Sequence, residues 1–161
     1  MAQRPCVWNH VIFDIGVVIS IGTASIGSFS APVCARETHA FRQTRSVWDG
    51  VYTEEQAKRG EAQYLDQCAR CHGPSLEGGE MGRGLVGDSF GSDWNDMSVG
   101  GLFERVRASM PQDNPGRLSR QQTADILAFV LSKNKFPAGG MDLPTQTDVL
   151  NQIKFLASKP D

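Results

Sequence analysis

A short motif with two thiols and an imidazole contains the side chains of this sequence that are best suited to chemistry. It reads CARCHG, so that two residues separate Cys68 from Cys71 and His72 follows the second thiol directly. Side chains of these types at this spacing have three chemical interpretations: a redox-active disulfide, half of a zinc site, or the attachment point of a haem. The surrounding sequence discriminates between the three.

The zinc and disulfide interpretations each leave something unexplained. A structural zinc site takes four ligands, usually from two such pairs, and no second Cys or His pair follows His72. A thioredoxin-like motif requires a βαβ setting, whereas this pair follows a helix-like segment and precedes a glycine-rich one. Haem attachment uses every group, because each thiol adds to one vinyl group of the porphyrin and His72 ligates the iron.

A ligand for the opposite face of the iron is expected from a methionine. His39 is the less suitable candidate, since it lies in the N-terminal lead-in, close to the expected cleavage sites of an export signal. We predict Met110 for this position. It stands at the expected end of a helix, and Pro111 holds the residue before it in an extended conformation.

Three other internal methionines compete with Met110. Met81 follows His72 too closely to reach around a macrocycle. Met97 remains possible, and Met141 lies after the third expected helix. An isolated methionine usually fills an irregular gap in a hydrophobic core, and we assign this role to all three.

Composition limits the classes of function that the chain can have. Its 161 residues are enough for one domain with a modest core. The formal net charge is −2, and no basic stripe is present, so nucleic acid is not an expected partner. Two of the four cysteines, Cys6 and Cys34, lie near the N-terminus, so only the pair in the motif remains if that segment is removed.

Residues 1–35 are predicted to be an export signal. An uncharged, mildly apolar run at 15–31 is followed by small residues, with cleavage expected after Ala35 or, as second choice, after Ala40. The alternative is an uncleaved membrane anchor, although glycine and serine dilute the run below a good spanning segment. Export to the periplasm agrees with covalent haem attachment, which occurs in an oxidising setting.

Helix signals divide the rest of the chain. Residues 36–52 are expected to form an extended lead-in, and the first helix should begin at Thr53, where Thr53 and Gln56 fit a capping box. It should run toward Cys68. The glycine-rich residues 73–97 are expected to hold little regular structure.

Two further helices and a short last one are expected after this loop. One spans 98–109 with a serine cap. The next starts at Ser119 with a second capping box and carries an apolar stripe of Ile126, Leu127 and Val130. A short helix fits 145–156. No strand is predicted, so the fold class is all-α with large loops.

With CARCHG, MPQDNPGRLS and LAFVLSKNKFPAGG in view, the sequence over about residues 50–157 resembles bacterial class I c-type cytochromes. More narrowly, it resembles small periplasmic monohaem cytochromes that often work beside quinoprotein or related dehydrogenases. The resemblance implies a cytochrome c domain at 53–157, with three to five helices and long loops wrapped around one covalent haem c. It also implies attachment through Cys68 and Cys71, with His72 and Met110 as axial ligands.

The resemblance also implies how the first and last core helices meet. They should cross at Gly60, with Tyr64 and Phe129 beside the contact. Such a crossing explains why a glycine stands inside the first helix, although it destabilises that helix by roughly 1 kcal/mol relative to alanine. One position departs from the pattern. Relatives often have a proline whose carbonyl accepts the N–H of the ligating histidine, whereas Arg83 stands there in a Gly-Arg-Gly sequence. We expect the carbonyl to be available but held less firmly, with an effect on the reduction potential.

Histidine and methionine ligation together favour one-electron transfer. The predicted function is therefore a periplasmic electron carrier and not an enzyme, accepting electrons from a dehydrogenase and passing them toward a terminal oxidase. The alternatives are a fixed haem subunit of a dehydrogenase complex and a peroxidase-like or gas-binding haem protein. A membrane is an expected partner only if the leader stays uncleaved. Aromatic residues expected to line the pocket are Phe90, Trp94 and Phe103, and charged residues expected to be solvated are Arg70, Asp113 and Arg117.

Overall fold

The structure is a computed structural model that describes residues 45–160. The predicted export signal at 1–35 and the lead-in up to residue 44 lie outside the described residues. Within 45–160, no helix combines the length and apolar character needed to cross a membrane.

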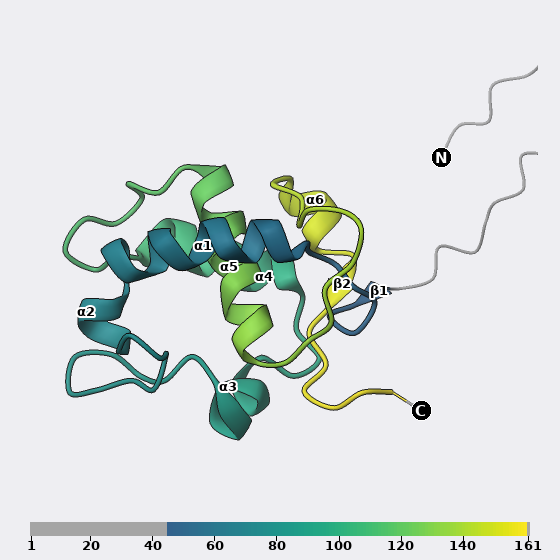
Figure 1. Ribbon diagram of the computed structural model, residues 1–161, viewed down its shortest axis with the longest axis horizontal. Helices are drawn as coiled ribbons and strands as arrows, with labels where there is room; N and C mark the ends of the chain where they lie inside the picture. The colour runs from purple at the N-terminus through teal and green to yellow at the C-terminus, as the bar shows by residue number, and fades with distance from the viewer. Residues whose placement is uncertain (1–44, 161) are drawn as a thin grey trace, which may run out of the picture. The chain divides into compact units, whose positions relative to one another are not determined.

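The described part of the chain is helical, as predicted, with one very small sheet (Figure 1). In chain order the elements are β1 (Arg45–Ser46), α1 (Glu54–Gln67), α2 (Ala69–His72), α3 (Gly87–Trp94), α4 (Val99–Ser109), α5 (Arg120–Lys133), α6 (Thr147–Leu150) and β2 (Ile153–Lys154). The predicted helices that begin after Thr53, Ser98 and Ser119 are confirmed as α1, α4 and α5.

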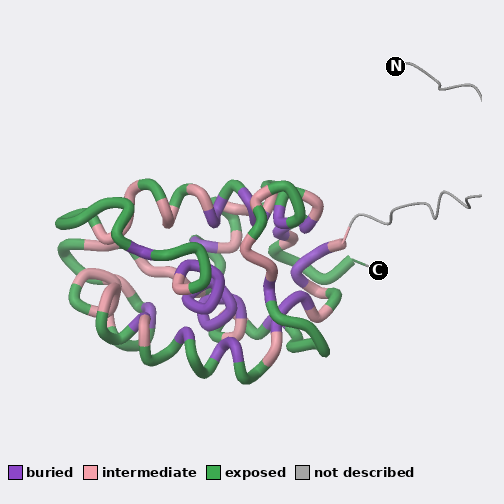
Figure 2. The backbone as a smooth tube through the Cα atoms, turned by 90° about the horizontal axis from the view of Figure 1, so that it is seen from above, coloured by how far each residue is buried: buried purple, intermediate pink, exposed green. Residues whose placement is uncertain are grey.

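Helices α1 and α5 cross at Gly60, as the resemblance implied (Figure 1). A Cβ atom added at Gly60 would lie 1.8 Å from the backbone oxygen of Asp125, so only glycine permits this approach. The rings of Tyr64 and Phe129 pack beside the contact, with centroids 5.2 Å apart. Residues 123–131 of α5 are all buried, and Figure 2 shows this helix at the centre of the domain. The crossing therefore forms the core on which the loops are built.

The two predicted capping boxes differ in the structure. At α5, Ser119 Oγ accepts from the backbone N–H of Gln122 and the Ser119 N–H donates to Gln122 Oε1, so that box is complete. At α1, Thr53 Oγ1 accepts from the N–H of Gln56 at 3.1 Å, but the Gln56 side chain does not return the bond. It is buried and pairs with both backbone groups of Leu143, so the prediction of a full box at α1 is wrong.

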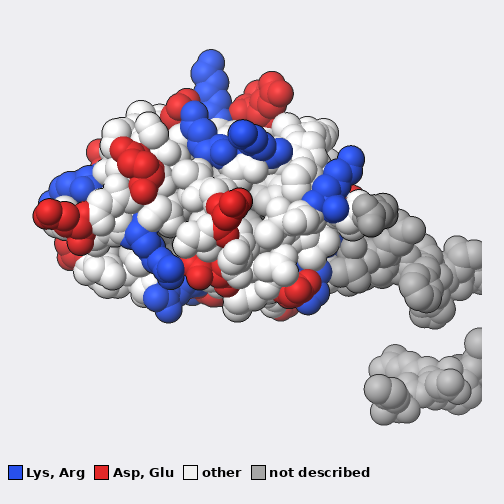
Figure 3. All heavy atoms as spheres, turned by 90° about the horizontal axis from the view of Figure 1, so that it is seen from below, with Lys and Arg blue, Asp and Glu red and all other residues white. Residues whose placement is uncertain are grey.

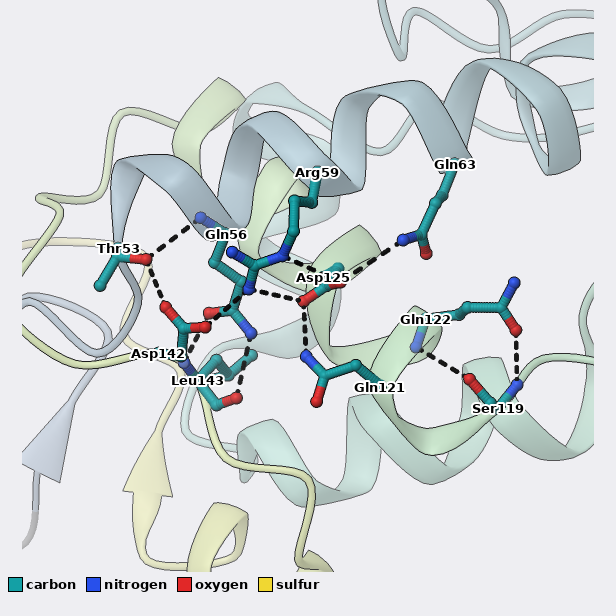
Figure 4. A network of polar contacts seen from close by, with 10 residues as sticks. All are labelled: Thr53, Gln56, Arg59, Gln63, Ser119, Gln121, Gln122, Asp125, Asp142 and Leu143. Carbon is teal, nitrogen blue, oxygen red and sulfur yellow. Dashed lines mark hydrogen bonds and ion pairs between the residues drawn. The ribbon is translucent and has the colours of Figure 1, made fainter.

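A polar network fixes α1 against α5 and against the segment that follows α5 (Figure 4). The buried carboxylate of Asp125 accepts from Gln121 at 2.8 Å and pairs with Arg59 at 3.4 Å. Arg59 also pairs with Asp142 at 2.6 Å, and Asp142 in turn accepts from the hydroxyl of Thr53. Because a buried carboxylate is costly without partners, these bonds specify how the three segments meet.

The lead-in belongs to the core from its first described residues. Val47 and Val51 are buried, the Trp48 indole N–H donates to the Leu156 carbonyl at 2.9 Å, and the Tyr52 hydroxyl donates to the Phe136 carbonyl at 2.6 Å. Residues expected to be an extended approach to the domain thus supply part of its hydrophobic interior.

The prediction of no strand and of a helix over 145–156 is wrong in part. Strands β1 and β2, each two residues long, pair in parallel. Helix α6 ends at Leu150, after which Ile153 and Phe155 are buried and Lys154 between them is exposed. This alternation has the period of a strand, and it overrides the helical spacing that the sequence also allows.

A helix also interrupts the segment 73–97, where little regular structure was predicted. Helix α3 spans Gly87–Trp94, with Phe90 buried and packed edge-on against Phe155 at 5.8 Å between centroids. Phe90 and Trp94 are four residues apart and share one helix face. That pair of aromatic residues is the sequence signal for α3.

Candidate functional site

A large cavity brings the predicted site residues together. Its volume is about 1180 Å³, and its walls include Cys68, Cys71, His72 and Met110. Residues from α3, α4, α5 and the loop before α3 surround these groups with apolar side chains, namely Leu85, Phe90, Trp94, Leu102, Val106, Ile126, Leu127 and Val130. The cavity therefore combines two thiols, an imidazole and a thioether in apolar surroundings.

The thiols and the imidazole are positioned by the end of α1 and by the single turn of α2. The Cys68 N–H donates to the Tyr64 carbonyl at 2.8 Å, which closes α1, and the His72 N–H donates back to the Cys68 carbonyl at 3.0 Å. Gly73 then leaves the helix with a φ of 77°, a conformation that favours glycine. The Tyr64 hydroxyl donates to the Gly73 carbonyl at 2.7 Å, so the α1–α5 crossing is tied directly to the motif.

The Cys68 thiol is held in its neutral form. Burial, with a smaller contribution from neighbouring Cys71, raises its pKa to about 11. A thiolate, not a thiol, is the usual metal ligand and redox nucleophile. The environment of Cys68 thus suits a thiol that is consumed in a covalent bond better than a thiolate that stays reactive. Within residues 45–160, no group of three or more His, Cys, Asp or Glu side chains is placed to hold a metal ion.

His72 is oriented by a backbone carbonyl. Its Nδ1 lies 2.7 Å from the carbonyl oxygen of Arg83. Because a carbonyl can only accept, Nδ1 carries the proton and Nε2 keeps its lone pair for a metal. The Arg83 carbonyl is therefore available to His72, as predicted for the position where relatives have proline.

Met110 ends α4, as predicted, and lies on the cavity wall. Its N–H donates to the Val106 carbonyl at 2.9 Å, and its backbone is extended, with φ −122° and ψ 149°. Its side chain is half-buried. Pro111 and Gln112, which follow it, also line the cavity.

The prediction that the other three internal methionines fill the core is wrong. Met81, Met97 and Met141 are 63%, 48% and 65% exposed. Met97 and Met141 do not line the cavity, whereas Met81 does. Met81 belongs to the loop whose Arg83 carbonyl accepts from His72, so it lies on the same side of the site as the imidazole. Sequence alone does not distinguish an exposed loop methionine from a buried one.

The aromatic predictions are correct for two residues of three. Phe90 and Trp94 line the cavity, but Phe103 does not. Phe103 is fully buried in the core, and the Arg120 guanidinium lies 5.0 Å from its ring centroid. The spacing of apolar residues in α5 predicted one apolar helix face but not its role at the site. Ile126 and Val130, which belong to that face, line the cavity.

Charged residues at the cavity form a contact that the sequence did not reveal. The side chains of Arg70 and Asp113 are mostly exposed, as predicted, but they pair at 3.2 Å and so connect α2 to the loop after Met110. Arg117 is exposed. An exposed pair of this kind contributes little to stability.

On the face shown in Figure 3, acidic and basic groups are interspersed, and neither sign forms a large patch.

The family comparison identifies the domain. A family model described as "Cytochrome C oxidase, cbb3-type, subunit III" matches residues 55–130. The described domain is a c-type cytochrome. The match begins in α1 and ends in α5, and it includes the motif, the loop that carries Arg83, and Met110.

Two further comparisons complete this result. Among solved structures, a chain of the sulfane dehydrogenase SoxCD from Paracoccus pantotrophus is similar, with 22% identity and a TM-score of 0.45. The similarity covers 67% of this chain and 61% of that chain, so the cytochrome spans less than two thirds of the other's length. No curated protein sequence matches this one.

The cavity of the cytochrome fits the haem that such a domain implies. Two thiols one helical turn apart suit two vinyl groups, an imidazole nitrogen with a free lone pair and a thioether are the kinds of group that bind haem iron, and the apolar walls suit a porphyrin. Haem-based electron transfer is the chemistry of this class of domain.

Proposed function

We propose that this protein is a periplasmic one-electron carrier that holds one haem c covalently through Cys68 and Cys71, with His72 and Met110 as the two axial ligands. A single observation supports the proposal most strongly. One cavity contains both thiols, an imidazole whose Nδ1 donates to a carbonyl, and the methionine at the end of α4.

When bound, the haem supplies a one-electron redox couple, and the surrounding residues of the chain would control its reduction potential and its access to water. His72 and Met110 would both bind its iron, which would leave no position there for a substrate. Buried apolar side chains on α4 and α5 exclude water from the site. Histidine and methionine ligation raises the reduction potential, which suits a carrier that receives electrons from a dehydrogenase.

The proposed partners are a dehydrogenase as donor and, directly or through another cytochrome, a terminal oxidase as acceptor. The description of the matching family as subunit III of a cbb3-type oxidase supports an oxidase on the acceptor side. The same description favours a second candidate, in which the domain is a fixed haem subunit of a larger complex. Co-purification from the native host distinguishes the two, since a carrier is recovered free and a subunit with its partners.

The proposed location follows from the first 35 residues. We infer that they direct export, because an apolar run without charges precedes small residues at Ala35 and Ala40. N-terminal sequencing of the periplasmic protein should begin at Arg36 or at Phe41. Recovery of the intact chain in the membrane fraction would favour an anchor instead.

Ligand binding by the unmodified protein tests whether it is a carrier. With both axial positions filled by the chain, the reduced protein should bind carbon monoxide slowly or not at all at neutral pH, and the oxidised protein should not turn over peroxide. Rapid binding of carbon monoxide would show an accessible iron. The proposal of an electron carrier would then give way to a peroxidase-like or gas-binding function.

A further inference from the structure

The loop that orients His72 has an unusual construction. The acceptor of the Nδ1 proton is the carbonyl of Arg83, which lies between Gly82 and Gly84. Glycine on both sides gives the chain more conformational freedom than a proline would allow. The position of this carbonyl must therefore be fixed by contacts from elsewhere in the domain.

The first such contact is made by the side chain of Arg83 itself. Its guanidinium Nη2 lies 2.8 Å from Oδ2 of Asp93, on α3. The two side chains are 71% and 41% exposed, so the pair adds little to global stability. It does, however, restrict the one residue whose carbonyl His72 uses.

The second contact comes from Asn134, the residue that caps the C-terminus of α5. Its Nδ2 donates to the Leu85 carbonyl at 2.9 Å and to the Val130 carbonyl at 2.8 Å. Its Oδ1 accepts from the Gly87 N–H at 3.2 Å. One half-buried amide thus ties the chain just after Arg83 to the buried central helix.

Bonds within the loop connect these contacts to His72. The Leu85 N–H donates to the Leu76 carbonyl, and the Gly78 N–H donates to the carbonyl of His72, both at 2.8 Å. The loop also lies close to the imidazole, since a Cβ atom added at Gly82 would be 3.0 Å from His72 Nδ1. A shift of the loop would therefore move the Arg83 carbonyl relative to the ring.

We propose that Asp93 and Asn134 are positioning residues for His72. Asp93 holds the side chain of Arg83, Asn134 holds the chain at Leu85 and Gly87, and together they replace the restraint that a proline would provide. The inference rests on the proposed function, in which His72 ligates iron. A firm bond from Nδ1 raises the basicity of the ligand and stabilises ferric iron, so loosening either contact should raise the reduction potential.

The test uses the haem-loaded protein and measures both the reduction potential and the exchange rate of the His72 Nδ1 proton by NMR. Asn134→Ala removes no charge. This substitution should raise the reduction potential. It should also increase the exchange rate of the Nδ1 proton by about tenfold, the size expected for loss of hydrogen bonds at a half-buried site. Asp93→Asn should speed exchange by about threefold, as for an exposed ion pair, and Asp93→Glu should restore the rate.

Charge effects are separated from positioning by Arg83→Gln, which keeps the carbonyl but removes the pair with Asp93. Loss of a positive charge alone lowers the potential, and loss of the negative charge in Asp93→Asn alone raises it. A positioning role predicts faster exchange of the Nδ1 proton in both variants. A pure charge effect leaves the exchange rate unchanged and moves the reduction potentials of the two variants in opposite directions.

Glu61→Gln is the matched control, because it breaks the exposed pair with Lys133, which is not at the cavity.

Two kinds of failure can be told apart. If the ring signals of His72 in the parent lack the shifts that ligation to iron produces, the proposed function itself is wrong. If those shifts are present and proton exchange is the same in the parent, Asp93→Asn and Arg83→Gln, only the positioning role is overturned. The Asp93 and Arg83 variants keep the test of the role of Asp93 decisive even if Asn134→Ala does not fold.

Discussion

The α1–α5 crossing and the loop walls of the cavity maintain their geometry in different ways. At the crossing, backbone meets backbone, because Gly60 lets α1 approach the carbonyl of Asp125 directly. Buried rings of Tyr64 and Phe129 fill the space beside it. This contact cannot adjust without separating two helices.

The loops around the cavity depend instead on a few side-chain contacts that reach across the fold. The Tyr64 hydroxyl holds Gly73, Asn134 holds the chain beyond Arg83, and Arg70 pairs with Asp113 after Met110. Individually these contacts are weak. Stability and redox chemistry therefore depend on different contacts, so substitutions in the two regions should affect different measurements.

The largest effect on chemistry is expected from the thiols. A variant with both Cys68→Ala and Cys71→Ala should lose all covalently bound haem, because among residues 45–160 no other thiol lies at the cavity. Either single substitution should leave one linkage. Acid–acetone extraction followed by absorption of the protein fraction is the measurement. Haem that stays with the double variant after extraction would show that the motif is not the attachment point.

The largest effect on stability is expected at the crossing. Gly60→Ala places a Cβ atom 1.8 Å from a backbone oxygen, and overpacking of this kind typically costs about 1–3 kcal/mol. Denaturant unfolding should show this loss while the reduction potential of the folded protein stays near that of the parent. A free energy of unfolding equal to the parent's would contradict the crossing.

A matched control lies in α4. In Gly101→Ala the nearest atom to the new Cβ is Ser98 Oγ at 3.5 Å, an ordinary contact. Alanine is favoured over glycine inside a helix by roughly 0.5–1 kcal/mol. The control should therefore be as stable as the parent or slightly more stable.

Tyr64 connects the two regions and should produce a smaller, mixed effect. Tyr64→Phe keeps the ring against Phe129 but removes the bond to the Gly73 carbonyl. We expect a loss of about 1 kcal/mol in the free energy of unfolding. We also expect a change in potential, since Gly73 directly follows His72. An effect on stability without any effect on potential would show that the motif is independent of this bond.

The smallest effect is a pH dependence at the periphery of the crossing. The hydrogen bond from Thr53, followed by that from Arg59, lowers the pKa of Asp142 below its ordinary value of 3.8. A carboxyl group whose pKa is lower in the folded state than in the unfolded state stabilises the protein when the pH is above its unfolded-state pKa. This stabilisation is lost as the pH falls through its folded-state pKa. In Asp142→Asn, the melting temperature should therefore fall less steeply than in the parent below about pH 4.

Glu80→Gln, at an exposed loop position, is the control for this acid titration and should keep the parent's slope. If the parent and Asp142→Asn lose stability in parallel, Asp142 does not contribute to acid sensitivity.

The crossing was largely predictable from sequence, and the loop contacts were not. Capping residues and helical spacing act over a few residues, so α1, α4, α5 and the role of Gly60 could be inferred from local patterns together with the family resemblance. The motif and Met110 stand out by residue type and position, and the structure places all of them at one cavity.

Contacts between distant residues depend on tertiary approach, which no local pattern encodes. The pairs Arg83–Asp93 and Arg70–Asp113 join separate loops and helices. The burial of Val47 depends in the same way on the rest of the domain packing over it. A tertiary contact also explains why the α1 capping box is incomplete, since Gln56 bonds to Leu143 instead.

His72 and Met110 are proposed to be the two axial ligands of the haem iron, and the near-infrared spectrum of the oxidised protein can test this assignment. Haems with histidine and methionine ligands show a weak sulfur-to-iron charge-transfer band there, as in the cytochromes that this chain resembles. The parent should show the band, and Met110→Ala should lose it and have a lower reduction potential. Met81→Ala, Met97→Ala and Met141→Ala should each retain it. A band that persists in Met110→Ala, or that disappears in Met81→Ala, would contradict the account.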